Sequence, residues 1–218
     1  MKPFPEYQSN DFFETDFQPF IDLPGFFPGA GGFFHGCDRK CEKSIIFYGT
    51  DFGELSYQRR LAETGGEPET NKTVKTLRAI VIASGLSLNS CFLTNVVLGL
   101  TKGDEAVGNY ESTFKRFPDY IQACALWHRE WLKGIMPKLV VFMGTPNMSD
   151  YGTRIFPELS GAWSKFNSLK DLYSAGAELV KIQNGPSVLL MYHPSSRWHL
   201  HPSDTKQRII RHLEQFAT

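Results

Sequence analysis

The chain lacks the features that mark several broad classes of protein. Over its 218 residues no apolar run is as long as a membrane span, and the N-terminus has no basic start followed by an apolar stretch. Lysine plus arginine equals aspartate plus glutamate, at 23 each, so no strong general attraction to nucleic acid is expected. We therefore expect a soluble, cytoplasmic monomer without a membrane partner, in which any DNA or RNA site is local.

Common catalytic and metal-binding motifs are also missing. There is no Walker sequence, no G-x-S-x-G and no H-E-x-x-H. The four cysteines lack the dense pattern of a disulfide scaffold, so reduced thiols are expected. Cys37 and Cys41 have C-x-x-x-C spacing, and His193, His199 and His201 form H-x5-H-x-H. Neither pattern places a tight ligand pair on a clear helix or strand, so we predict no metal site.

The first 40 residues differ in character from the rest. Nine phenylalanines lie there among proline, glycine and aspartate, with no helical or strand period. Because exposed rings would be costly, we interpret residues 1–40 as an aromatic-rich arm packed on a single domain formed by residues 41–218. The alternative is a lid or partner-binding segment. The length and the 41% hydrophobic content are enough for one substantial core.

Apolar runs and helical patterns alternate through residues 41–218. The strand-like runs are 44–48, 91–97, 138–143 and 188–192, and the helical patterns are 71–84, 118–134 and a last segment capped by Ser203. Four short apolar strands separated by helices predict an α/β protein with helices on both faces of the sheet. The expected architecture is a three-layer sandwich with a four-stranded, mainly parallel central sheet.

Polar residues lie at or near the ends of three of these predicted strands. Asp51 follows the first, Asn95 lies near the end of the second, and His193, in H-P-S at 193–195, follows the fourth. Because the carboxyl ends of parallel strands lie at one edge, these side chains can meet in one crevice. A carboxylate can activate water, an amide can both donate to and accept from a ring edge, and a histidine can stabilise negative charge on oxygen. Together they predict hydrolysis that releases a heterocyclic anion.

Each of the three residues also has a purely structural interpretation. Asp51 can cap the turn after its strand, and Asn95 can satisfy neighbouring backbone groups. His193 can be an ordinary hydrogen-bonded histidine. The functional interpretation therefore depends on the three strand ends converging in space.

The ordered set of motifs resembles the uracil-DNA glycosylase superfamily. The set is G-T-D-F-G at 49–53, T-N-V-V at 94–97 and H-P-S at 193–195, within a resemblance covering roughly residues 44–217. It implies the fold of that superfamily and a base-excision repair activity. The implied reaction is hydrolysis of the N-glycosidic bond of uracil, or a related damaged base, swung out of the DNA stack.

The resemblance also implies roles for individual residues. Asp51 would activate water, Asn95 would read the base edge, and His193 would stabilise the departing anion. Phe52 stands where members usually have proline, and Phe52 or Tyr57 would contact the base in place of the family's stacking ring. The DNA-contacting residues would be Ser195, Ser196, Arg197 and Trp198. This chemistry needs no metal cofactor.

Two departures from the family pattern leave other functions open. The family stacks a phenylalanine on the base about a dozen residues past the first motif, but residues 63–69 here read E-T-G-G-E-P-E. Stacking contributes about 1–3 kcal/mol per base, and acidic residues near the site would repel phosphates. The alternatives are a catalytically weak relative that binds nucleic acid or nucleobases, and a small-nucleoside hydrolase on the same scaffold.

One branch of the superfamily carries an iron–sulfur cluster on four cysteines. Cys124 matches its last ligand position, but Gly99 stands at the third. Cys37 and Cys41 have the wrong spacing for the remaining two, so we do not expect a cluster.

Overall fold

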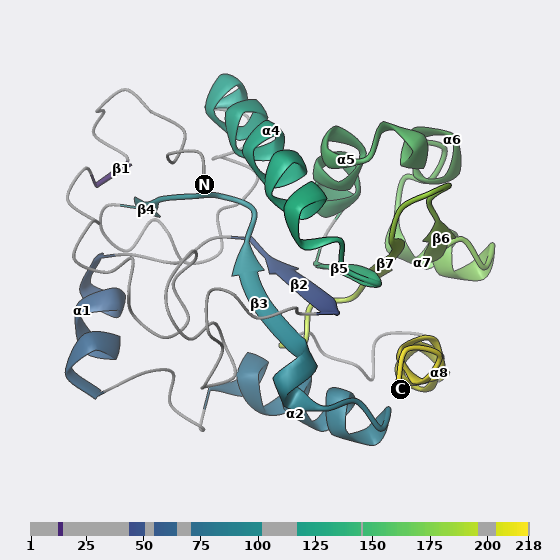
Figure 1. Ribbon diagram of the computed structural model, residues 1–218, viewed down its shortest axis with the longest axis horizontal. Helices are drawn as coiled ribbons and strands as arrows, with labels where there is room; N and C mark the ends of the chain where they lie inside the picture. The colour runs from purple at the N-terminus through teal and green to yellow at the C-terminus, as the bar shows by residue number, and fades with distance from the viewer. Residues whose placement is uncertain are drawn as a thin grey trace.

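A five-stranded, mostly parallel β-sheet forms the centre of the protein (Figure 1). The computed structural model describes residues 13–14, 44–50, 55–64, 71–101, 117–144, 146–195 and 204–217. The central strands are β2 (Ile45–Gly49), β3 (Cys91–Asn95), β5 (Leu139–Met143), β6 (Leu179–Lys181) and β7 (Ser187–Met191). Their order is β3-β2-β5-β7-β6, with only β6 antiparallel to its neighbour. The predicted α/β class is confirmed, but the predicted number of four strands is wrong.

The three inner parallel strands are completely buried. Every residue of β2, β5 and β7 is buried, as expected for strands covered on both faces. Their continuous apolar sequences are the reason that these strands could be predicted. The observed strands lie within one residue of the predicted positions, except that β3 ends at Asn95, earlier than the predicted boundary at residue 97.

The strand of the central sheet that was not predicted from the sequence is β6, at one edge. It is joined to β7 by a tight turn, in which the N–H of Ile182 donates to the carbonyl of Pro186 at 3.1 Å. Asn184 has a φ of 58°, the left-handed conformation that asparagine tolerates better than most residues. An Asn-Gly pair between two apolar runs is a strong hairpin signal. This pair, at residues 184 and 185, could therefore have revealed the fifth strand.

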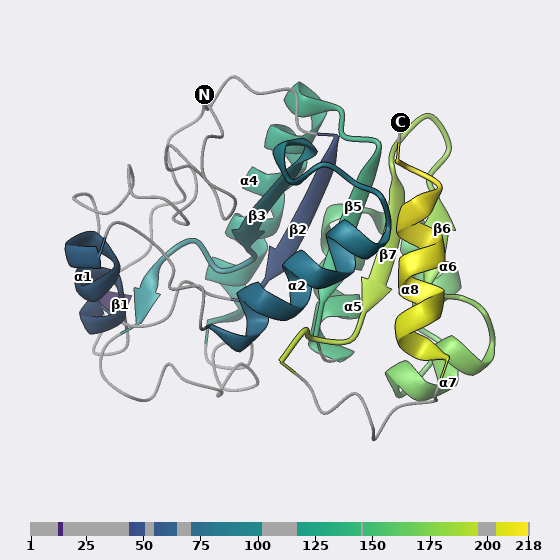
Figure 2. The ribbon, with the colours of Figure 1, turned by 90° about the horizontal axis from the view of Figure 1, so that it is seen from below.

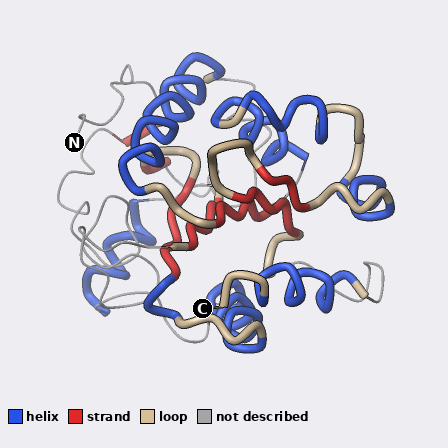
Figure 3. The backbone as a smooth tube through the Cα atoms, turned by 45° about the vertical axis from the view of Figure 1, so that its right-hand side comes forward, coloured by secondary structure: helices blue, strands red, loops and turns tan. Residues whose placement is uncertain are grey.

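Helices cover both faces of the sheet (Figure 2). One face carries α2 (Lys72–Ala83) and α8 (Thr205–Glu214), and the other carries α4 (Pro118–Ile135) and α5 (Pro146–Ile155). Figure 3 shows the strands between these two layers. The other described helices are α1 (Leu55–Thr64), α6 (Ser160–Trp163) and α7 (Leu169–Ser174), with 3₁₀ turns η2 (Leu88–Ser90) and η4 (Pro157–Leu159).

Local sequence signals explain several helix ends. The Asn71 side chain accepts hydrogen bonds from the N–H groups of Thr73 and Val74, at 2.9 and 3.3 Å, and so caps α2. Proline begins α4, where its missing donor is not needed. The predicted cap of the last helix is wrong. The N-cap position of α8 is Asp204 rather than Ser203, and the Asp204 side chain makes no capping hydrogen bond.

A short strand pair involves the predicted N-terminal arm. β1 (Phe13–Glu14) pairs antiparallel with β4 (Leu100–Thr101), which follows β3 in the chain. The rest of residues 1–40 lies outside the described residues, so the packed arm and the lid both stay predictions. No helix in the described ranges has both the length and the apolar character needed to cross a membrane.

Candidate functional site

The strand order reverses at the centre of the sheet. From β2 the chain moves outward to β3 and then crosses back to β5 and β7 on the other side. In open α/β sheets, ligands bind beyond the carboxyl ends of the strands at such a reversal. Asn95 is the last residue of β3, and His193 follows the end of β7 by two residues. The structure therefore brings these two predicted site residues to the same edge.

Asn95 lies across the end of the neighbouring strand. The parallel register pairs it with Gly49, and a β-carbon on residue 49 would overlap the Asn95 side-chain oxygen. The amide thus reaches from β3 toward the point where the strand order reverses. Glycine at position 49 is explained by this close approach, because any side chain would displace the Asn95 amide.

Main-chain hydrogen bonds hold the first two motifs together beyond the end of the ladder. The N–H of Val96 donates to the carbonyl of Gly49 at 3.0 Å, and the N–H of Val97 donates to that of Thr50 at 2.9 Å. The segment after β3 therefore runs alongside the segment after β2. Asp51 is the residue that follows Thr50 in the sequence. Asp51 and Phe52 themselves lie outside the described residues, so their predicted roles are untested.

His193 is held by the serine that follows it in the H-P-S motif. Its Nδ1 lies 2.7 Å from the Ser195 hydroxyl and 3.2 Å from the Ser195 main-chain nitrogen. A main-chain N–H can only donate, so both hydrogen bonds are satisfied when Nδ1 accepts and the ring proton is on Nε2. Burial lowers the pKa of His193, which favours the neutral ring. Within the described residues, no hydrogen-bond partner is recorded for Nε2.

The spacing of the strands allows Asn95 and His193 to flank a ligand rather than touch each other. β3 and β7 are three strand positions apart, or about 14 Å at the usual spacing. Asn95 already reaches over Gly49 on β2, and β2 and β7 are two strand positions apart, or about 10 Å at the usual spacing. Such a gap suits a single planar ring that hydrogen-bonds to both side chains.

A buried network that the sequence analysis missed lies behind Asn95. The imidazole of His128, on α4, is fully buried and lies between two partners. Its Nε2 is 3.1 Å from the main-chain carbonyl oxygen of Asn95, and its Nδ1 is 3.0 Å from the hydroxyl of Tyr48. The next carbonyl, that of Val96, accepts a hydrogen bond of 3.0 Å from the Tyr151 hydroxyl. The backbone at the end of β3 is therefore fixed by side chains from the helical layer.

The remaining predicted DNA-contacting residues are only partly described. Ser195 is half-buried, and its recorded side-chain hydrogen bond is to His193. Ser196, Arg197 and Trp198 lie outside the described residues. Ser195 is thus placed to orient the imidazole, and its predicted contact with DNA is untested.

Two of the four cysteines lie within the described residues, and both are in the core. Cys91 and Cys124 are free and buried, and burial raises the pKa of Cys124 to about 12. Cys37 and Cys41 lie outside the described residues. Across the described ranges, no three histidine, cysteine or acidic side chains cluster in a way that could hold a metal ion.

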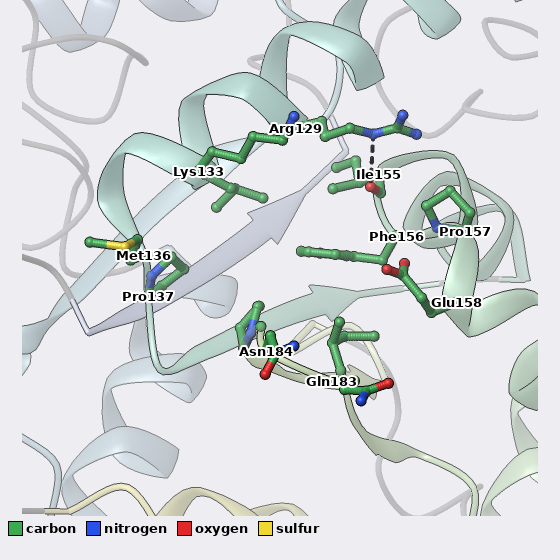
Figure 4. A pocket seen from close by; sticks show the side chains of 14 residues that line it. Arg129, Lys133, Met136, Pro137, Ile155, Phe156, Pro157, Glu158, Gln183 and Asn184 are labelled. Carbon is green, nitrogen blue, oxygen red and sulfur yellow. Dashed lines mark hydrogen bonds between the residues drawn. The ribbon is translucent and has the colours of Figure 1, made fainter.

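A cavity of about 620 Å³ lies away from this site (Figure 4). It is bordered by the end of α4, by Phe156 and Glu158 after α5, and by the turn between β6 and β7. The turn and the end of α4 lead into the amino ends of β7 and β5, so the cavity is at the opposite edge of the sheet from Asn95 and His193. It is not part of the candidate site.

No family model matches the chain, and no curated protein matches it.

Proposed function

We propose that this protein is a DNA glycosylase that hydrolyses the N-glycosidic bond of uracil or a related damaged base. The observation that carries the proposal is the pair of hydrogen bonds between His193 Nδ1 and Ser195, from which the neutral state of the ring follows. A neutral imidazole with its proton on Nε2 stands at the sheet edge that also presents the Asn95 amide. The order of motifs along the chain, which resembles that of uracil-DNA glycosylases, adds to this support.

His193 suits the departure of a base as an anion. When the bond from the sugar C1′ to the base nitrogen breaks, its electron pair leaves with the base, and negative charge builds on a ring oxygen. A hydrogen bond from Nε2–H to that oxygen strengthens as the charge grows, and therefore lowers the barrier. A neutral donor is sufficient for this role, in keeping with the lowered pKa of His193.

Asn95 suits recognition of the base. Its amide offers an N–H donor and a carbonyl acceptor side by side. Uracil presents the complementary pair, a carbonyl oxygen next to a ring N–H. Because the Asn95 amide is packed against Gly49 and its main chain is fixed by His128, its hydrogen-bonding direction is set before the ligand binds.

We assign the water-activating role to Asp51, which follows β2 by two residues. Its carboxylate would accept a proton from the water as the water oxygen bonds to C1′. Phe52 would lie beside the base, and Ser196, Arg197 and Trp198 would contact the DNA. We assign Ser195 to orienting His193, because its hydroxyl is already hydrogen-bonded to the imidazole.

Base release from defined oligonucleotides tests this proposal. The full chain is incubated with single-stranded and duplex DNA containing uracil, hypoxanthine or xanthine, and abasic sites are revealed by alkaline strand scission. Scission at one of these bases, lost in His193→Ala, is the expected result. Absence of scission on every substrate overturns the proposal. In that case, tight binding to base-modified DNA would indicate a binding protein, and hydrolysis of free nucleosides would indicate a small-molecule hydrolase.

A further inference from the structure

We infer that His128 is a positioning residue for this site: the buried pair of Tyr48 and His128 fixes the main-chain carbonyl of Asn95, and with it the direction of the Asn95 amide. The structural part of this inference is independent of the reaction. Its consequence for catalysis rests on the proposed function.

The three groups come from separate elements and meet in the core. Tyr48 is on β2, His128 is on α4 and Asn95 ends β3, and neither Tyr48 nor His128 is exposed to solvent. The rings of Tyr48 and His128 meet edge to face, with centroids 4.9 Å apart. Trp127 and Tyr151 also pack edge to face on the imidazole, at 5.3 and 6.3 Å. The imidazole is therefore held on several sides and cannot rotate without disturbing its neighbours.

The partners of the two ring nitrogens determine where the proton lies. A main-chain carbonyl only accepts, so His128 Nε2 must carry the proton and donate to Asn95. Nδ1 is then an acceptor, and the Tyr48 hydroxyl donates to it. Burial lowers the pKa of His128 to about 3, so this neutral form persists throughout the physiological pH range.

The position of β3 explains why a side chain is needed here. Within the described sheet, β3 is an edge strand, so its outward carbonyls have no strand partner. His128 supplies a partner to the carbonyl of Asn95, while the N–H of Val96 is bonded to Gly49 on the opposite side. The peptide group joining residues 95 and 96 is thus held at both ends. This fixes the backbone that carries the base-reading amide.

Substitutions of His128 and Tyr48 separate positioning from simple packing. His128→Leu removes both hydrogen bonds, whereas His128→Gln can still direct an N–H to the Asn95 carbonyl. Tyr48→Phe removes only the bond that fixes the ring proton. Tyr173→Phe is the matched control, because Tyr173 is equally buried and its hydroxyl also donates to a strand carbonyl at 3.0 Å, that of Leu190 on β7.

We expect these variants to differ in activity. A misplacement of about 1 Å in a site costs about 100-fold in rate, so His128→Leu should lower kcat/KM for base release by about this factor. His128→Gln should restore most of the loss, Tyr48→Phe should be intermediate, and Tyr173→Phe should match the unsubstituted protein. If His128→Leu unfolds, Tyr48→Phe and His128→Gln decide the question.

A second measurement does not depend on activity. The Asn95 side-chain amide is observed by ¹⁵N nuclear magnetic resonance in the folded full chain and assigned by its loss in Asn95→Asp. We expect its two proton signals to move or broaden in His128→Leu and Tyr48→Phe, and to stay unchanged in Tyr173→Phe. Unchanged signals in the first two variants overturn the inference. Shifted signals in a protein with no base-release activity would instead refute the proposed function and leave the positioning role standing.

Discussion

The side-chain oxygen of Asn95 occupies the space that a β-carbon on Gly49 would need. The two residues are register partners at the carboxyl ends of adjacent parallel strands. The T-N-V-V motif therefore supplies the Asn95 amide. The G-T-D-F-G motif supplies a glycine that leaves room for this amide. This contact explains in physical terms why glycine and asparagine occupy these two strand ends.

Gly49→Ala should damage the site more than the fold. The new methyl group must push the Asn95 amide aside, and overpacking of this kind costs about 1–3 kcal/mol in stability. Displacement of the amide should lower base-release activity by about 100-fold. Gly134→Ala on α4 is the control, because its β-carbon would meet no atom within 4 Å and alanine favours the helix. Equal activity in the two variants would contradict a role for the Gly49–Asn95 contact.

His193 and Ser195 should contribute unequally to activity. His193→Ala removes the Nε2–H donor, and loss of one such donor typically lowers kcat by about 100- to 1,000-fold. Ser195→Ala keeps the main-chain N–H that bonds Nδ1, so the ring proton stays on Nε2 and we expect a loss of about tenfold or less. The measurement is single-turnover base release, and equal losses would argue against this division of roles.

The pH dependence of activity follows from the neutral state of His193. Burial lowers its pKa below that of an ordinary histidine, about 6.5. The neutral ring therefore predominates above pH 6.5, and protonation of Nδ1, which breaks its hydrogen bond from the Ser195 N–H, takes place at lower pH. We expect kcat/KM to change by less than about twofold from pH 6.5 to 8, because more than half of the rings are already neutral at pH 6.5. An activity that rises as the pH falls through 6.5 would instead indicate that the imidazolium is the active form.

Most of the scaffold could be predicted from the sequence because its signals are local. Continuous apolar runs mark the fully buried strands, and the spacing of Val74, Leu77 and Val81 marks α2. The α5 helix was missed although its buried residues Met148, Tyr151 and Ile155 follow a helical period, because polar residues and a glycine separate them. The three residues of β6 are half-exposed or exposed, so they form no buried apolar run. The signal for this strand is the Asn-Gly turn that joins it to β7.

The position of Asn95 and His193 could be predicted from the sequence, but the network behind Asn95 could not. Asn95 ends one apolar strand and His193 closely follows another, so topology alone predicts that they share an edge. The network behind Asn95 depends on contacts between distant parts of the chain. His128 is 33 residues from Asn95 and 80 from Tyr48. The sequence places His128 on the apolar face of α4, but only the folded chain shows which groups it meets.

Acid should destabilise the protein partly through His128. Its pKa is about 3 when folded and about 6.5 when unfolded, so the unfolded state binds a proton more readily. Stability contributed by the neutral ring is complete above pH 6.5 and is lost as the pH falls toward 3, by about 4–5 kcal/mol in total. Glutamine does not bind a proton in this pH range. In His128→Gln, the free energy of unfolding measured with denaturant should therefore depend less steeply on pH below 6.5. A stability difference that is the same at pH 8 and pH 4 would contradict this origin.

A buried carboxylate should make α8 sensitive to loss of a single arginine. The side chain of Glu178 is 1% exposed, and its Oε1 accepts hydrogen bonds from Arg208 and from Nε2 of His212, both on α8. Burial alone would raise the pKa of Glu178, but these hydrogen bonds outweigh it and the pKa lies below the usual value. Arg208→Met leaves that buried charge with less compensation and should lower the free energy of unfolding by about 2–3 kcal/mol. Lys133→Met breaks only the exposed pair with Glu130 and should cost about 0.5 kcal/mol or less, so similar losses in the two variants would show that Glu178 does not depend on Arg208.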